Sequence, residues 1–114
     1  MRKIILLSVI FFLVFPLFVA YSGETDGFSY DNVHFKKSSG DHVEVIGEIT
    51  NHSGRSYRMV SFTLSVYDDS GNLLDTAPIV ISNFKDGQTK SFSTIVQASY
   101  DELSRYKIDF EWHH

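Results

Sequence analysis

The run from Val60 to Asp68 alternates apolar and polar side chains with a period of two. Its apolar members are Val60, Phe62, Leu64 and Val66, and its intervening members are Ser61, Thr63, Ser65 and Tyr67. Successive side chains of a β-strand point to opposite faces of the sheet, so this pattern predicts a central strand with one buried face. The run therefore requires a second layer to cover its apolar face.

Shorter segments of the same kind recur about every ten residues, separated by polar turns, and no helical period interrupts them. The expected strands are Phe28–Phe35, His42–Asn51, Leu73–Ile81, Thr89–Val96 and Arg105–Trp112. In the last strand, one face is expected to carry Tyr106, Ile108, Phe110 and Trp112. Six or seven such strands predict an all-β, antiparallel β-sandwich.

Three further features of these segments carry expectations. Gly47 interrupts a strand face without a side chain, which predicts that an aromatic residue of the facing sheet fills the gap. Pro78 lacks a backbone donor, so its strand is expected at a sheet edge or at a change of sheet. Residues Gln97–Leu103 are expected to form a crossing or a single helical turn with Ser99 as its cap.

The first 22 residues have the composition of an export signal. Arg2 and Lys3 precede the apolar run Ile4–Ala20, and small residues before Gly23 fit a cleavage site. An uncleaved N-terminal anchor is the alternative, because this run of 17 residues, apolar except at Ser8 and Pro16, approaches the length of a membrane span. Residues 23–27 are expected to form a flexible spacer, and residues 28–114 a single small domain.

Charge and cysteine content limit the class of partner. Loss of Arg2 and Lys3 with the signal changes the formal charge from −4 to −6, which disfavours nucleic acid and anionic lipid as partners. Membrane association is therefore expected only through an uncleaved N-terminal segment. The sequence contains no cysteine, so a secreted or periplasmic domain of this kind has to be held together by core packing alone.

Three ordered blocks resemble the signatures of the small secreted FxLYD domains. Leu64-Ser65-Val66-Tyr67-Asp68 is similar to the Phe-x-Leu-Tyr-Asp signature of that family, with Leu64 and Val66 in the places of its Phe and Leu. The blocks Gly47–Ser53 and Phe84–Phe92 are similar to the family's Gly-Glu-x-x-Asn-x-Ser and Leu-x-x-Gly-Glu-Thr-x-x-Phe segments. The resemblance implies an immunoglobulin-like sandwich in exported prokaryotic proteins. It implies no catalytic residues.

The polar face of the central strand is the candidate binding surface. Its members are Met59, Ser61, Thr63, Ser65 and Tyr67, with Met59 and Tyr67 expected at the middle of an exposed patch. The corresponding function is a non-catalytic interaction module of the cell envelope. Its expected partner is an unknown envelope protein or a surface polymer.

Histidines supply the alternative site. If Phe28–Phe35 and His42–Asn51 pair as a hairpin, His34 and His42 would approach each other, with Asp31 or Asp41 as a carboxylate ligand. That arrangement would suit a periplasmic or extracellular metal-handling protein, although the spacing matches no established motif. A third hypothesis is a structural spacer or self-assembling subunit that adds strands edge to edge.

Other polar clusters favour structural roles. The loop Asp68–Asn72 lacks the ligand spacing of a calcium loop, so Asp68 is expected to bind turn amides. Asn51-His52-Ser53 fits a glycosylation sequon, but the turn is expected to need Asn51 for its own backbone. No motif arranges Ser, His and Asp for catalysis, so the sequence predicts neither an enzyme nor a cofactor.

Overall fold

The computed structural model describes residues 23–25 and 27–113, which form seven strands and one short 3-10 helix. The strands are β1 (Gly23–Thr25), β2 (Phe28–Lys37), β3 (His42–Asn51), β4 (Tyr57–Tyr67), β5 (Leu73–Phe84), β6 (Thr89–Gln97) and β7 (Arg105–His113). The helix η1 (Tyr100–Glu102) joins β6 to β7, as expected for that crossing, although Ser99 makes no side-chain cap bond.

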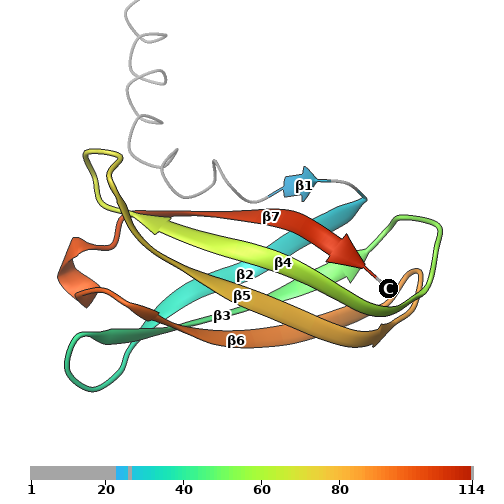
Figure 1. The fold of residues 1–114 in the computed structure, drawn as a ribbon, viewed down its shortest axis with the longest axis horizontal. Coiled ribbons are helices and arrows are strands. Elements are labelled where there is room, and N and C mark those ends of the chain that lie inside the picture. The colour runs from blue at the N-terminus through green and yellow to red at the C-terminus, as the bar shows by residue number, and fades with distance from the viewer. Residues whose placement is uncertain (1–22, 26, 114) are drawn as a thin grey trace, which may run out of the picture.

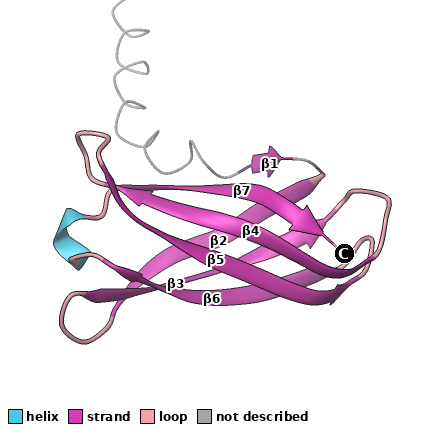
Figure 2. Ribbon diagram, viewed as in Figure 1, coloured by secondary structure: helices cyan, strands magenta, loops and turns pink. Residues whose placement is uncertain are grey.

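The strands form two antiparallel sheets packed face to face. One has the order β1-β2-β3-β6, and the other has the order β5-β4-β7 (Figure 1). In the view of Figure 2, the three-stranded sheet lies in front of the other sheet. The molecule is therefore an all-β, antiparallel sandwich, as the strand periodicity predicts, and it is immunoglobulin-like, as the family resemblance implies.

The core lies between the two sheets, and β4 supplies its centre. Val60, Phe62, Leu64 and Val66 are all fully buried, which confirms the alternation predicted for this strand. Phe28 of β2 packs against them, with its ring centroid 5.1 Å from that of Phe62 and 5.5 Å from that of Phe110. Each such buried side chain stabilises the fold by about 1.5–3 kcal/mol, so core packing takes the place of disulfides.

Gly47 faces this core, but the aromatic side chain over it comes from a different place than expected. Gly47 pairs with Phe92 of β6, and a Cβ atom on Gly47 would lie 2.8 Å from a ring carbon of Phe92. Phe92 belongs to the neighbouring strand of the same sheet, so the prediction of an aromatic from the facing sheet was wrong. Val33 Cγ2 closes the same gap at 2.8 Å.

One side of the sandwich is closed by bonds between the edge strands β5 and β6. Lys90 Nζ donates to the Ser82 carbonyl oxygen at 2.8 Å, and Thr94 Oγ1 donates to the Pro78 carbonyl oxygen at 3.2 Å. The backbone N–H of Gln97 donates to Asp75 Oδ2 at 2.7 Å. Pro78 thus lies in an edge strand, as expected, although β5 continues through it to Phe84.

The beginning of the described chain also differs from expectation. Gly23–Thr25 pairs with β2 as strand β1, with Glu24 opposite Ser29, where the sequence predicts a flexible spacer over residues 23–27. Backbone pairing is available there because β2 would otherwise present a free edge. The predicted signal or anchor, residues 1–22, lies outside the described residues. Within the described part of the chain, no helix has the length and apolar character needed to cross a membrane.

Candidate functional site

The predicted binding residues lie on the outer side of the three-stranded sheet, which we call the β4 face. Ser61 and Ser65 are only 7% and 8% exposed, while Met59, Thr63 and Tyr67 are partly buried. The expected open polar patch is therefore covered along its middle. Met59 and Tyr67 lie near opposite ends of β4 instead of at the centre of one patch.

The covering of the two serines follows from the position of β4 between two neighbours. In register, Val80 and Trp112 flank Ser61, and Thr76 and Lys107 flank Ser65. Cross-strand neighbours on one face are about 4.5–5.5 Å apart, so longer side chains lean over a short hydroxyl group. Small polar residues in a middle strand thus form the floor of the face, and the residues of the flanking strands form its surface.

A β-bulge in β7 changes the side to which its last residues point. Ser61 pairs with Trp112 and Phe62 pairs with Phe110, so Glu111 is the extra residue of the bulge. Phe110 packs against the core, whereas Trp112 lies on the β4 face and is 43% exposed. The expectation that Trp112 shares the inner face with Tyr106, Ile108 and Phe110 was therefore wrong at Trp112 alone.

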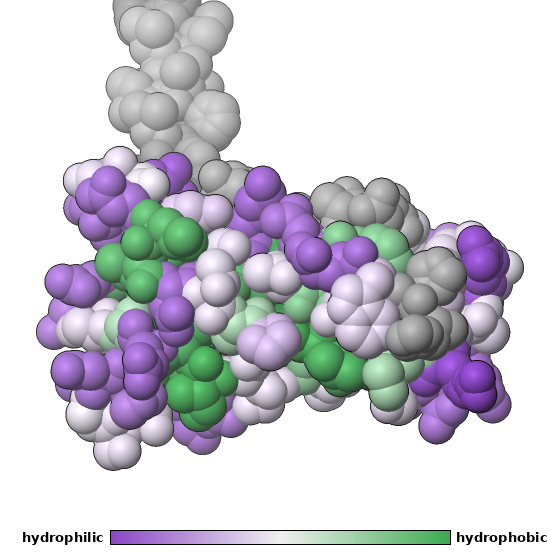
Figure 3. All heavy atoms as spheres, viewed as in Figure 1, coloured by the Kyte–Doolittle hydropathy of each residue, from purple (hydrophilic) through white to green (hydrophobic). Residues whose placement is uncertain are grey.

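The bulge creates an apolar region that the sequence analysis missed, and we call it the Trp112 patch. It consists of Trp112, Val80, which is 54% exposed, and the partly buried Met59, grouped around Ser61. Figure 3 views the three-stranded sheet and shows separate hydrophobic areas set among polar ones. The patch is thus a local apolar anchor on a mostly polar face.

The two candidate metal ligands occupy separate positions. His34 lies opposite Ile46, four residues beyond His42 on β3, which is roughly 13 Å along the hairpin at ~3.3 Å per residue. His34 Nδ1 is 3.0 Å from the Asn32 carbonyl oxygen, and His42 Nε2 is 3.4 Å from Gln97 Nε2. Among the described residues, no group of three or more His, Asp or Glu side chains has a geometry that could hold a metal ion.

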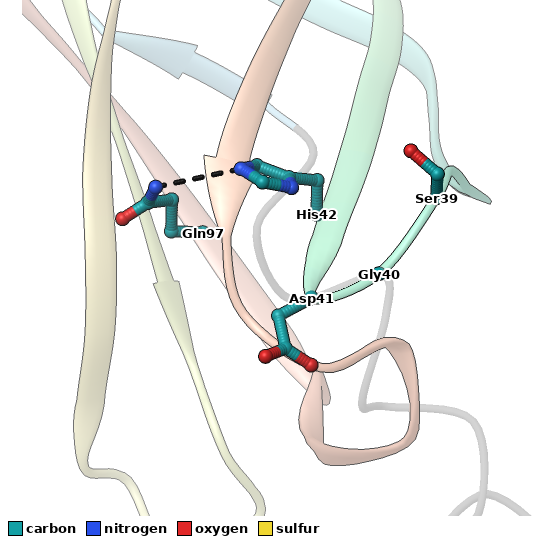
Figure 4. A pocket seen from close by; sticks show the side chains of 5 residues that line it. All are labelled: Ser39, Gly40, Asp41, His42 and Gln97. Atoms are coloured by element: carbon teal, nitrogen blue, oxygen red, sulfur yellow. Dashed lines mark hydrogen bonds between the residues drawn. The ribbon is translucent and has the colours of Figure 1, made fainter.

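The surroundings of His42 form an open surface hollow of about 580 Å³ at the β2–β3 turn. It is lined by Ser39, Gly40, Asp41, His42 and Gln97. In Figure 4 the His42 and Gln97 side chains point toward each other, while Asp41 points away from the imidazole ring. The hollow therefore offers dispersed hydrogen-bonding groups and no converging set of ligands.

Asn51 is fully buried and organises the loops at one end of the sandwich. Its Nδ2 donates to the carbonyl oxygens of Arg55 at 2.8 Å and Phe84 at 3.3 Å, and its Oδ1 accepts from the Ser53 N–H at 2.9 Å. Its backbone N–H donates to the Gln88 carbonyl oxygen at 2.9 Å. These bonds use the amide that a glycan would require, so the structural role expected for this turn is confirmed.

Asp68 holds the β4–β5 turn at the opposite end. Its Oδ1 accepts from the backbone N–H groups of Asn72 at 2.8 Å and Ser70 at 3.0 Å, which confirms the predicted binding of turn amides. The hydrogen bond from the Asn72 N–H is the largest influence that lowers the pKa of Asp68 below its ordinary value of 3.8. Asp68 is thus committed to the turn.

At this point the geometry defines a class: a small immunoglobulin-like β-sandwich domain with one partly apolar sheet face. No family model matches the chain, and no curated protein matches it either. Among solved structures, IrmA from Escherichia coli superposes with a TM-score of 0.58 at 16% identity, covering 75% of this chain and 77% of that chain. A DUF1425 family member from Shewanella sp. pv-4 superposes with a TM-score of 0.51 at 10% identity, over 75% and 77% of the two chains. At these identities the likenesses show a shared fold.

Proposed function

We propose that this protein is an exported, non-catalytic module of the cell envelope that binds another protein through the β4 face. One observation carries the proposal: the bulge at Glu111 places Trp112 on the outer face, 43% exposed, beside Val80 at 54%. Tryptophan is among the residues that most often dominate binding energy at protein interfaces. The signal-like segment with Arg2, Lys3 and the following apolar run supports export.

Charge on the same face supports a partner of defined chemistry. Arg105 and Lys107 lie beside Tyr67 and Ser65, about six residues or roughly 20 Å along β4 from the Trp112 patch. They gather positive charge on a chain whose formal net charge is −4. A complementary partner presents an apolar projection for Trp112 and acidic groups for the cationic end of the face.

The free edge of β7 is poorly suited to pairing with a strand of a second copy. This disfavours self-assembly through that edge and favours binding through the β4 face. β7 pairs on one side with β4 and is the outer strand of its sheet. It carries Lys107 and the bulge at Glu111, and both are devices that blunt edge-to-edge pairing. A self-assembling subunit that pairs through β7 is therefore a weaker interpretation than binding through the β4 face.

Site-specific photo-crosslinking in the producing cells tests the proposal. A photoreactive phenylalanine analogue replaces Val80 on the β4 face, and in a matched strain it replaces Ile95, which is 50% exposed and lies on the outer face of the other sheet. The expected result is one cross-linked protein from position 80 and none from position 95. The product should disappear when Trp112→Ser is added.

The composition of the product separates the alternatives. A product with twice the mass of this protein would show a second copy on the face and overturn the heterologous partner. A product in which this protein is joined to a glycan, with no second protein, would show that the β4 face binds a surface polymer. Equal yields from positions 80 and 95 would show that the β4 face has no special role.

A further inference from the structure

The cationic end of the β4 face contains a small pocket. It has a volume of about 300 Å³ and is lined by Tyr67, Gly71, Arg105 and Lys107. Its walls come from the end of β4, the following turn and the beginning of β7. The Ser104 N–H donates to the Tyr67 carbonyl oxygen at 2.9 Å, and the Gly71 N–H donates to the Asp68 carbonyl oxygen at 3.1 Å. The backbone around the pocket is therefore fixed on both sides.

Arg105 lies close to the turn that closes the pocket. A Cβ atom on Gly71 would be 3.4 Å from the Arg105 guanidinium nitrogen Nη2, and Gly71 has a φ of +88°. Glycine thus leaves space for the guanidinium group against the turn at a backbone conformation that other residues rarely adopt. Tyr67 is the cross-strand partner of Arg105, and both residues line the pocket.

The polar groups of this pocket are largely uncommitted. Among the described residues, neither the Tyr67 hydroxyl nor the Arg105 guanidinium makes a hydrogen bond or an ion pair. Lys107 Nζ lies 3.9 Å from Asp109 Oδ2, with both side chains about half exposed, so that pairing is weak. The Asp68 carboxylate accepts hydrogen bonds from the Ser70 and Asn72 N–H groups and from the Asn72 side-chain amide, and in the part of the chain that the structure describes it forms no ion pair with Arg105 or Lys107.

We infer that this pocket binds a carboxylate group. A guanidinium fork matches the two oxygens of a carboxylate, and the Tyr67 hydroxyl and Lys107 ammonium groups add donors. The volume lies at the lower end of ligand pockets, which suits one side-chain-sized group. The inference rests on the proposed function, because it supplies the acidic complement of the partner.

A titration of the isotopically labelled, purified exported protein by NMR tests the inference without the partner. N-acetylglutamate α-amide represents an acidic side chain, N-acetylglycine a chain terminus, and glucuronate a polymer, each at constant ionic strength. The expected result is saturable shifts of the Arg105 side-chain N–H and the Gly71 amide. The best of the three probes identifies the source of the carboxylate.

Variants make the assignment specific. Arg105→Gln should weaken binding of the best probe by about tenfold, since charge-assisted hydrogen bonds are lost. The affinity of Arg105→Lys should lie between those of the wild type and Arg105→Gln. Tyr67→Phe, which keeps the ring volume, should weaken it by a smaller factor. Arg58→Gln, a change at an exposed arginine near the opposite end of β4, should leave binding unchanged.

Two results would overturn the inference: shifts that rise linearly without saturation for all probes, or equal affinity in the wild type and Arg105→Gln. Either result with the position-80 cross-link intact would remove the carboxylate pocket and leave the β4 face as the binding surface. Saturable carboxylate binding without any cross-link would retain the pocket and remove the proposed protein partner.

Discussion

Phe92 lies across the backbone of Gly47, so a Cβ atom on Gly47 would stand 2.8 Å from Phe92 Cε2. The two residues are cross-strand partners on β3 and β6, and both are buried. Packing on the inner face of this sheet therefore requires glycine at position 47, so that the large ring of Phe92 on the neighbouring strand can cover it. Val33 closes the remaining space from β2.

Gly47→Ala is expected to destabilise the domain by about 1–3 kcal/mol, because the added methyl group overpacks a filled site. Urea denaturation measures the change. Combining Gly47→Ala with Phe92→Leu should give a smaller loss than the sum of the two single losses, because the shorter side chain leaves room for the methyl group. Strict additivity of the two losses would contradict the contact.

Asn51→Ala is expected to cost about 2–4 kcal/mol in the free energy of unfolding, since several buried hydrogen bonds lose their partner at once. The affected groups include the Arg55 and Phe84 carbonyls and the Ser53 N–H. Ser70→Ala, at an exposed turn where the side chain is open to solvent, serves as the control and should change stability by less than about 0.5 kcal/mol. Comparable losses for the two variants would refute the special role of Asn51.

The pKa of Asp68 gives a prediction with a defined sign. Because turn amides lower its pKa in the folded state below 3.8, its ionised form stabilises the fold above pH 3.8, and this contribution is lost as the pH falls through the folded-state pKa. The urea midpoint of the wild type should therefore fall more steeply on acidification than that of Asp68→Asn. Parallel curves for the wild type and Asp68→Asn would contradict the linkage.

Trp112 is the only tryptophan in the chain, so its fluorescence reports its environment directly. With 43% of its surface exposed, it should emit at long wavelength and be quenched by iodide in the folded protein. A blue-shifted emission that iodide does not quench would place the indole in the core. That result would contradict the bulge at Glu111, which places Trp112 on the outer face.

The sequence predicts the strands well because each strand contains its own alternation. His42–Asn51 agrees with β3 at both ends, and β4 and β6 differ from prediction by a few terminal residues. The four core residues of β4 follow from the same pattern, since an inward face needs only the local period. The structural roles of Asn51, which is buried, and of Asp68, which holds an exposed turn, were also predictable, because turns select side chains that bond their own backbone.

The candidate surface was predicted less well because it depends on pairing between strands. Nothing in the run Phe110-Glu111-Trp112 distinguishes a regular strand from a bulged one, and the bulge appears only in the register with β4. The burial of Ser61 and Ser65 likewise depends on which side chains flank them. For the same reason, Gly47 indicated a close aromatic ring but not the strand that supplies it.

The most direct test of the β4 face as a binding surface uses fluorine NMR of the protein with a fluorinated tryptophan at its single position. Once the cross-linked partner is identified, it is added unlabelled to the labelled protein. The account predicts that the Trp112 resonance shifts or broadens to a saturable end point, and that it becomes less sensitive to a soluble paramagnetic agent. An unchanged Trp112 resonance while the partner is bound, as measured by sedimentation, would contradict the account.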